Sequence, residues 1–242
     1  MKIKSKIITA LFAVSFGYNT AQAASIQFTD WTLQTAGSPS AVGNYALTIS
    51  TTASADVFNF NLTVNPLNAD ALGLFIDIGS FNFGTTPELS NINTVPTGGD
   101  IKLFASDTTS DDCGNGCNLN GGGASGSAID PVSGFLGDGQ WELVVRLDTN
   151  GSAHVYQTFS FDVSHLTGVN LSQFNLAAIR AQTVCTVSGA TIPCSSTTSE
   201  KAQSLPGEIV DPEGGQVPEP TVIALLGIGL LGFGISRKGK LS

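Results

Sequence analysis

Apolar and polar residues alternate with a period of two along much of the middle of the chain. The clearest rows are Phe58 to Val64, Leu72 to Ile78 and Trp141 to Leu147, with shorter rows at Tyr45 to Ile49 and Phe159 to Val163. Such alternation puts apolar side chains on one face and polar side chains on the other, which is typical of half-buried strands. The pattern predicts about eight strands, each with one polar face.

Turn-forming residues separate these rows, and no long stretch repeats at helical spacing. Asn150-Gly151 is the strongest of the turns, because both residues accept the positive φ of a type I′ hairpin. We therefore expect an all-β body in which two antiparallel sheets pack face to face, as a jelly-roll-like β-sandwich.

The first 23 residues have the pattern of a secretory signal peptide. Lys2, Lys4 and Lys6 precede an apolar run from Ile7 to Phe16, and the small-residue motif Ala21-Gln22-Ala23 ends the segment. The apolar run is shorter than the roughly 20 residues that a membrane-spanning helix needs. We expect signal peptidase to remove residues 1–23.

The body between the two ends is strongly acidic. We expect one sandwich domain at 24–200, followed by a Pro- and Gly-containing flexible linker at 201–216. Four basic and 18 acidic side chains lie between the signal peptide and residue 217, a net charge of −14. Such a surface repels nucleic acid and anionic lipid, and it attracts divalent cations.

Four cysteines lie in the body: Cys113, Cys117, Cys185 and Cys194. An even number in an exported chain favours disulfides. Three pairings are open, and the two local pairs, Cys113 with Cys117 and Cys185 with Cys194, are preferred because they close short loops. A zinc site is the alternative, but the spacing fits a zinc ribbon poorly.

The stretch from Thr108 to Gly126 is expected to be a long surface loop that contains the first cysteine pair. Oxygen-bearing side chains crowd there, which is the chemistry that calcium requires. The loop only half resembles an EF-hand and lacks its closing Glu, so a solvated loop without metal is preferred, and no other cofactor is expected. The calcium candidates are Asp107, Asp111, Asp112, Asn115 and Asn118.

Motifs of catalysis are weak in this chain. His154 and His165 are the only histidines, and no Gly-x-Ser-x-Gly elbow accompanies them. The run Gly121 to Gly126 fits a dinucleotide motif by composition alone, without a strand and a helix around it. Glycoside hydrolysis needs only two carboxylates, but no local signature marks such a pair. We expect no enzyme activity.

The C-terminal segment, residues 217–242, combines a proline motif, an apolar run and a basic end. Val217-Pro218-Glu219-Pro220 precedes the run from Thr221 to Ile235, which has about the minimum length for a single transmembrane helix. The basic residues, Arg237, Lys238 and Lys240, would stay in the cytoplasm and leave the body outside. The two prolines prevent helix at the motif and hold an extended backbone that a peptidase can bind.

This segment resembles the PEP-CTERM sorting signal of Gram-negative bacteria, with Thr221 where Ser is frequent. The resemblance implies recognition and cleavage by exosortase, a membrane-embedded cysteine peptidase, and a link to extracellular polysaccharide and biofilm. The protein would be anchored transiently in the inner membrane and then reach the cell envelope, the outer surface or the extracellular matrix. Residues Leu72 to Asp77 also resemble the bodies of uncharacterised members.

We therefore expect a non-enzymatic structural or adhesive protein. A glycan- or calcium-binding module is the second hypothesis, and a glycoside hydrolase the third. Exposed aromatic rings distinguish the first two, because a glycan platform needs a planar ring at the surface. Trp31 and Trp141 are the candidates: Trp141 is expected in the core, and the pattern leaves the side of Trp31 open.

Overall fold

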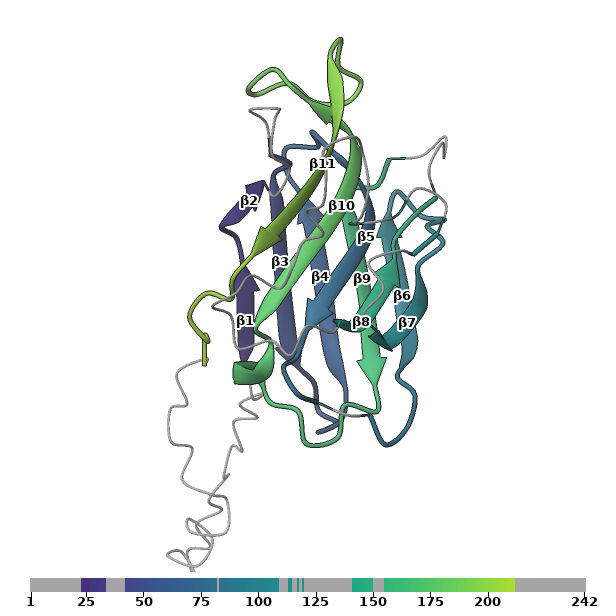
Figure 1. Ribbon diagram of the computed structural model, residues 1–242, viewed down its shortest axis with the longest axis vertical. Coiled ribbons are helices and arrows are strands. Elements are labelled where there is room, and N and C mark those ends of the chain that lie inside the picture. Colours follow the sequence, from purple (N-terminus) through teal and green to yellow (C-terminus); the bar gives the residue numbers. More distant parts are fainter. Residues whose placement is uncertain are drawn as a thin grey trace, which may run out of the picture. The chain divides into compact units, whose positions relative to one another are not determined.

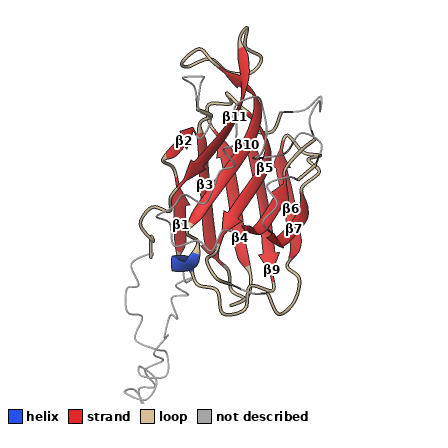
Figure 2. Cartoon of the chain, in the orientation of Figure 1, coloured by secondary structure: helices blue, strands red, loops and turns tan. Residues whose placement is uncertain are grey.

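The computed structural model describes residues 23–33, 42–81, 83–108, 113, 114, 117, 119, 141–149 and 155–211. These residues form two antiparallel sheets and one short 3₁₀ helix, η1 (Leu171–Gln173) (Figure 2). The predicted all-β architecture with two antiparallel sheets is confirmed. Sheet A has the order β1 (Ser25–Phe28), β3 (Tyr45–Thr51), β4 (Phe58–Val64), β9 (Thr158–Ser164), β6 (Glu88–Val95). Sheet B has the order β2 (Trp31–Leu33), β11 (Thr197–Ser204), β10 (Leu176–Cys185), β5 (Asp70–Asp77), β8 (Trp141–Arg146), β7 (Lys102–Thr108).

The later strands pair in a nested order (Figure 1). β7 pairs with β8, β6 with β9 and β5 with β10, so that each pair encloses the previous one along the chain and the sheets alternate. Each of these connections passes from one sheet to the other except the one between β7 and β8, which stays in sheet B. The sandwich therefore depends on contacts between residues far apart in the sequence.

Sheet A follows the predicted alternation. In β4 every second side chain, from Phe58 to Val64, is buried, and β9 repeats the pattern. Phe60 and Phe161 stack with their ring centroids 5.4 Å apart, between the two sheets. The other face of β4, with Asn59, Asn61 and Thr63, is only partly buried.

Sheet B departs from the prediction, because its central strand is buried on both faces. All eight residues of β5 are buried. Leu74 and Ile76 pack in the core between the sheets, whereas Phe75 belongs to a second apolar cluster on the opposite face. The expectation of one polar face on every strand is therefore wrong for β5, which lies beneath a further layer of residues.

Two residues that the alternation placed in the core between the sheets pack in this second cluster instead. Leu72 is a bulge residue: Arg180 pairs with Gly73 and Ala181 with Ala71, which leaves Leu72 without a partner in β10. The bulge shifts the phase of the row. Trp141 is buried as expected, but its ring packs against Phe75 in the second cluster.

Both disulfides are the predicted local pairs. Cys113 is bonded to Cys117, and their sulfur atoms lie directly over Gly73 of β5. A Cβ atom at Gly73 would lie 2.1 Å from Cys117 Sγ, so only glycine leaves room for this disulfide. The Cys185–Cys194 bond closes the hairpin between β10 and β11.

The domain boundary predicted at residue 200 is wrong. Lys201 to Ser204 complete β11 and are buried, although the composition of 201–216 indicated a linker. β11 is an interior strand of sheet B, between β10 and β2, and so belongs to the folded domain.

Candidate functional site

The predicted sorting motif and basic tail lie outside the described residues, but the chain leading to them is described up to Asp211. Residues 205–211, here called the exit segment, run along the outer side of β1. Gly207 N donates to Gln27 O at 2.7 Å, and Val210 N donates to Ser25 O at 2.8 Å. Ser25 N in turn donates to Val210 O at 3.0 Å. The exit segment therefore satisfies backbone groups that the edge strand β1 would leave open.

This pairing brings the two ends of the domain together. Ser25 lies two residues after the predicted signal-peptidase site, and Val210 lies seven residues before Val217. Their mutual hydrogen bonds join the first strand to the last described segment. In Figure 1 this junction lies at the lower left, and the hairpin between β10 and β11 lies at the opposite end, at the top.

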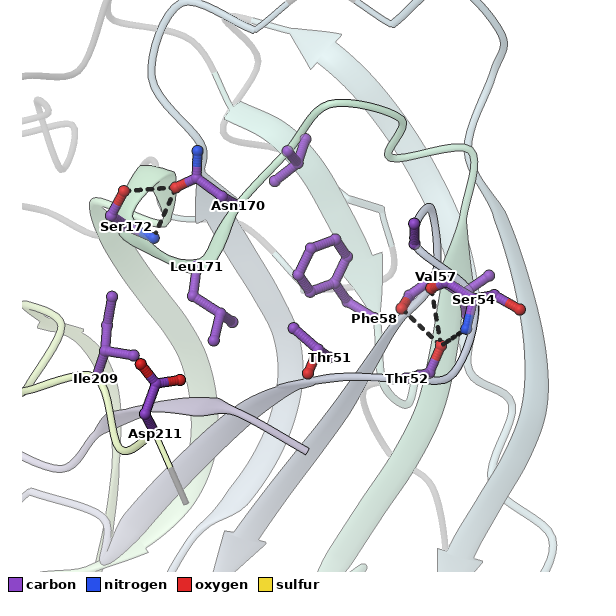
Figure 3. A pocket seen from close by; sticks show the side chains of 12 residues that line it. Thr51, Thr52, Ser54, Val57, Phe58, Asn170, Leu171, Ser172, Ile209 and Asp211 are labelled. Carbon is purple, nitrogen blue, oxygen red and sulfur yellow. Dashed lines mark hydrogen bonds between the residues drawn. The ribbon is translucent and has the colours of Figure 1, made fainter. Parts of the chain in front are cut away.

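A groove of about 440 Å³ lies beside the junction (Figure 3). We call it the exit groove. It is formed by the turn between β3 and β4, by η1 with the two residues before it, and by the exit segment. Phe58, Leu171 and Val169 are nearly fully buried and give it an apolar floor. Ile209 and Asp211 of the exit segment complete its wall.

Local hydrogen bonds fix both polar walls of the exit groove. Asn170 caps η1, because its side chain accepts from Ser172 N at 3.1 Å and its backbone N–H donates to the Gln173 side chain at 2.9 Å. Across the groove, Thr52 Oγ1 donates to Val57 O at 2.9 Å and accepts from Ser54 N at 3.2 Å. The walls are therefore set by short-range contacts that the sequence encodes locally.

A buried polar contact joins the two sheets near β2. The hydroxyl of Tyr45 on β3 donates to Glu200 Oε1 on β11, and Gly43 N donates to the same oxygen at 2.8 Å. Burial raises the pKa of Glu200, while these hydrogen bonds and the charge of Arg180 oppose the rise. Burial, with the charge of Glu200, also raises the pKa of Tyr45 well above its ordinary value.

A second buried carboxyl lies at the start of β5. Asp70 is 2% exposed, and its Oδ2 accepts from Gln182 Nε2 at 3.0 Å. Its Oδ1 has no hydrogen-bond partner among the described residues. Burial and, to a smaller extent, the charge of Asp148 raise the pKa of Asp70 to about 6, against the hydrogen bond from Gln182.

Only one of the calcium candidates, Asp107, lies within the described residues. Asp111, Asp112, Asn115 and Asn118 lie outside the described residues. Asp107 is exposed near the end of β7 and has a left-handed φ of 47°. Within the described ranges, no three His, Cys, Asp or Glu side chains are grouped so that they could hold a metal ion.

Trp31, Trp141 and His165 do not line the exit groove. Trp31 is 8% and Trp141 2% exposed, so neither ring offers a planar surface for a sugar. The Trp31 indole donates to Phe28 O at 3.0 Å and lies edge-on to Tyr45. His165 Nδ1 lies 2.9 Å from Thr86 O in a partly buried position, and His154 is outside the described residues.

The tail itself is identified by comparison with known families. Residues 216–238 match the model of the PEP-CTERM protein-sorting motif. The chain carries a PEP-CTERM sorting motif. The match includes Val217 to Pro220 and the basic residues Arg237 and Lys238, while Lys240 lies just beyond it. The resemblance predicted from the sequence is thus confirmed, and the motif marks an exported protein that exosortase sorts to the cell envelope.

None of the curated proteins and none of the solved structures match the chain. None of the helices in the described part of the chain is long and apolar enough to cross a membrane. The apolar run from Thr221 to Ile235, where a transmembrane helix is expected, lies outside that part.

Proposed function

We propose that the sandwich is a non-enzymatic structural or adhesive component of the cell surface or extracellular matrix, displayed after both terminal signals have been removed. Signal peptidase cuts after Ala23, and exosortase cuts near Val217 to Pro220. The tail anchors the precursor in the inner membrane until that second cut. Extracellular polysaccharide is the proposed partner of the mature protein.

The main support for this proposal is the hydrogen-bonded pairing of Ser25 with Val210. Both ends of the sandwich are hydrogen-bonded to each other inside the two expected cleavage sites. Removing either terminal segment therefore breaks no described backbone hydrogen bond of the sheets. A domain whose two ends are paired in this way can lose the signal peptide and the sorting tail and keep its fold. A module that is displayed at the cell surface needs this property.

Two further features support display outside the cell. The two disulfides suit an oxidising compartment. The acidic body resists binding to anionic lipid and nucleic acid, and it binds divalent cations diffusely, which would link it to acidic polysaccharides. Neither feature requires a catalytic centre.

The sorting step is tested by replacing Pro218, Glu219 and Pro220 with alanine. We expect export to continue and the tail to stay attached, so the intact mass of the cell-bound protein includes residues 217–242. Alanines at Glu213, Gly214 and Gly215 serve as the control and should leave tail removal unchanged. Tail loss at the same rate in both variants would refute the role of the motif.

The role of the body is tested by exchanging the sandwich domain for an unrelated domain. A strain without the protein is given either the whole chain or a chimera that keeps both signals around an unrelated domain. We expect only the whole chain to restore cell-bound polysaccharide, measured as the carbohydrate retained by washed cells. Equal rescue by the chimera, or release of reducing sugar ends from the polysaccharide by the purified protein, would contradict the structural role.

A further inference from the structure

The exit groove combines an apolar floor with an exposed apolar rim. Ile209 is 36% and Val210 51% exposed, in a segment only seven residues long. Exposed apolar side chains that gather beside a groove mark a surface that binds another molecule.

We propose that the exit groove is a docking surface for the extracytoplasmic face of the peptidase that cleaves the sorting motif. This rests on the proposed function, since it assumes cleavage near Val217 to Pro220. It adds that the folded body, and not only the tail, is recognised. The occupant is an apolar side chain of the peptidase with basic residues around it.

Chain length supports this partner. Val217 lies six positions after Asp211, and at roughly 3.3–3.6 Å for each extended residue this stretch reaches at most about 20 Å. A peptidase that holds the motif must therefore stand within about 20 Å of the exit groove. Asp211, from which the tether begins, itself lines the exit groove.

The short tether also makes a weak contact effective. Once the motif is bound, groove binding is intramolecular, and short flexible links give effective concentrations of about millimolar. Burying one apolar side chain contributes about 1.5–3 kcal/mol before ordering costs. A contact that is too weak to hold two separate proteins together can thus raise the rate of cleavage.

The groove's chemistry defines its occupant. Phe58 and Leu171 form the floor and point into the space in Figure 3. Hydroxyl and amide groups of Thr52 and Asn170 lie on opposite walls, and Asp211 adds an acidic side chain. An apolar anchor with positively charged neighbours fits this surface and the net negative charge of the body.

Two pairs of variants test the proposal in the full-length precursor. Ile209→Glu adds a charge at the groove, and Val187→Glu makes the same change at the exposed hairpin loop at the other end. Ser54→Arg fills the groove with a long positive side chain, and Ser188→Arg is its control in the hairpin loop. We expect about tenfold slower tail removal for the two groove variants, equivalent to about 1.4 kcal/mol, and no change for the controls.

Tail removal is followed by pulse labelling and mass analysis, and equal melting temperatures show that each variant folds. Normal cleavage of both groove variants would overturn the docking proposal. If the alanine variant of the motif is then still blocked, the sorting function stands without docking. If that variant is also cleaved normally, the proposed function fails as well.

A longer tether gives an independent test. Inserting 20 flexible Gly and Ser residues after Pro212 moves Val217 from about six to about 26 positions after Asp211, which lowers the effective concentration about ninefold. We expect slower cleavage of the lengthened chain and a smaller further effect of Ile209→Glu.

Two other results would show that the proposal is wrong. If Ile209→Glu turns a dimer into a monomer, the groove binds a second copy of the chain. If it abolishes binding to vesicles of neutral phospholipid, the groove binds the membrane.

Discussion

Replacing Asp70 by Asn should stabilise the protein at neutral pH. Asp70 is 98% buried at the start of β5, where one carboxyl oxygen accepts from Gln182 and the other has no partner among the described residues. The charge of Asp148 disfavours ionisation further. Asn keeps an acceptor for Gln182, has nearly the same shape, and carries no charge.

The magnitude follows from the pKa of Asp70, which rises from its ordinary value of 3.8 to about 6 in the folded protein. A difference of this size corresponds to about 3 kcal/mol. Because the folded state binds the proton more tightly than the unfolded chain, ionisation destabilises the fold, and stability is lost as the pH rises from about 4 to about 6. Above that range the charged Asp70 costs about 3 kcal/mol, and below it the cost disappears.

The assay is urea unfolding of the exported protein, with its disulfides intact, at several pH values from about 4 to 8. The free energy of unfolding of Asp70→Asn minus that of the unmodified protein should rise from near zero at pH 4 to about 3 kcal/mol at pH 7. Asp30→Asn, at an exposed carboxyl, is the control and should show no such rise. A difference that does not change with pH, or a variant that is less stable at pH 7, would refute the reasoning.

Two other substitutions test the packing of sheet B and the contact between the sheets. Gly73→Ala should lower the free energy of unfolding by about 1–3 kcal/mol in urea, because the new Cβ would lie 2.1 Å from Cys117 Sγ. Gly84→Ala, which meets nothing within 4 Å, should change it little, and equal effects of the two would count against this packing. Tyr45→Phe should cost about 1–3 kcal/mol in thermal or urea unfolding, since it removes the hydroxyl that donates to buried Glu200. A neutral result there would mean that the hydroxyl contact between the sheets contributes nothing to stability.

The sequence predicted the strands that have one buried face. β3, β4 and β9 alternate in sheet A as the pattern indicated, because only one of their faces packs against sheet B. The local cysteine pairs were also predicted correctly, since short loops favour them. The sorting signal is a linear motif, so it was identified from neighbouring residues alone, and the matching family model covers residues 216–238.

The sequence pattern did not predict the strands that lack alternation. β6 lies at an edge of sheet A and is mostly exposed, so its side chains carry no core pattern. β11 ends in four buried residues, Lys201 to Ser204, whose polar character indicated a linker. β11 is an interior strand of sheet B, between β10 and β2, which the local sequence does not reveal.

The sequence by itself marked the chain for export and sorting, indicated its all-β class and favoured the local cysteine pairs, because each of these depends on residues that are neighbours in the chain. Only the tertiary structure decided which face each residue occupies in sheet B, since the bulge at Leu72 shifts the phase and a second apolar cluster covers β5. It also decided the exit groove and the pairing of Ser25 with Val210. These features join segments more than 100 residues apart. Such segments meet only when the whole chain folds, so the residues next to either segment in the sequence do not reveal the contact.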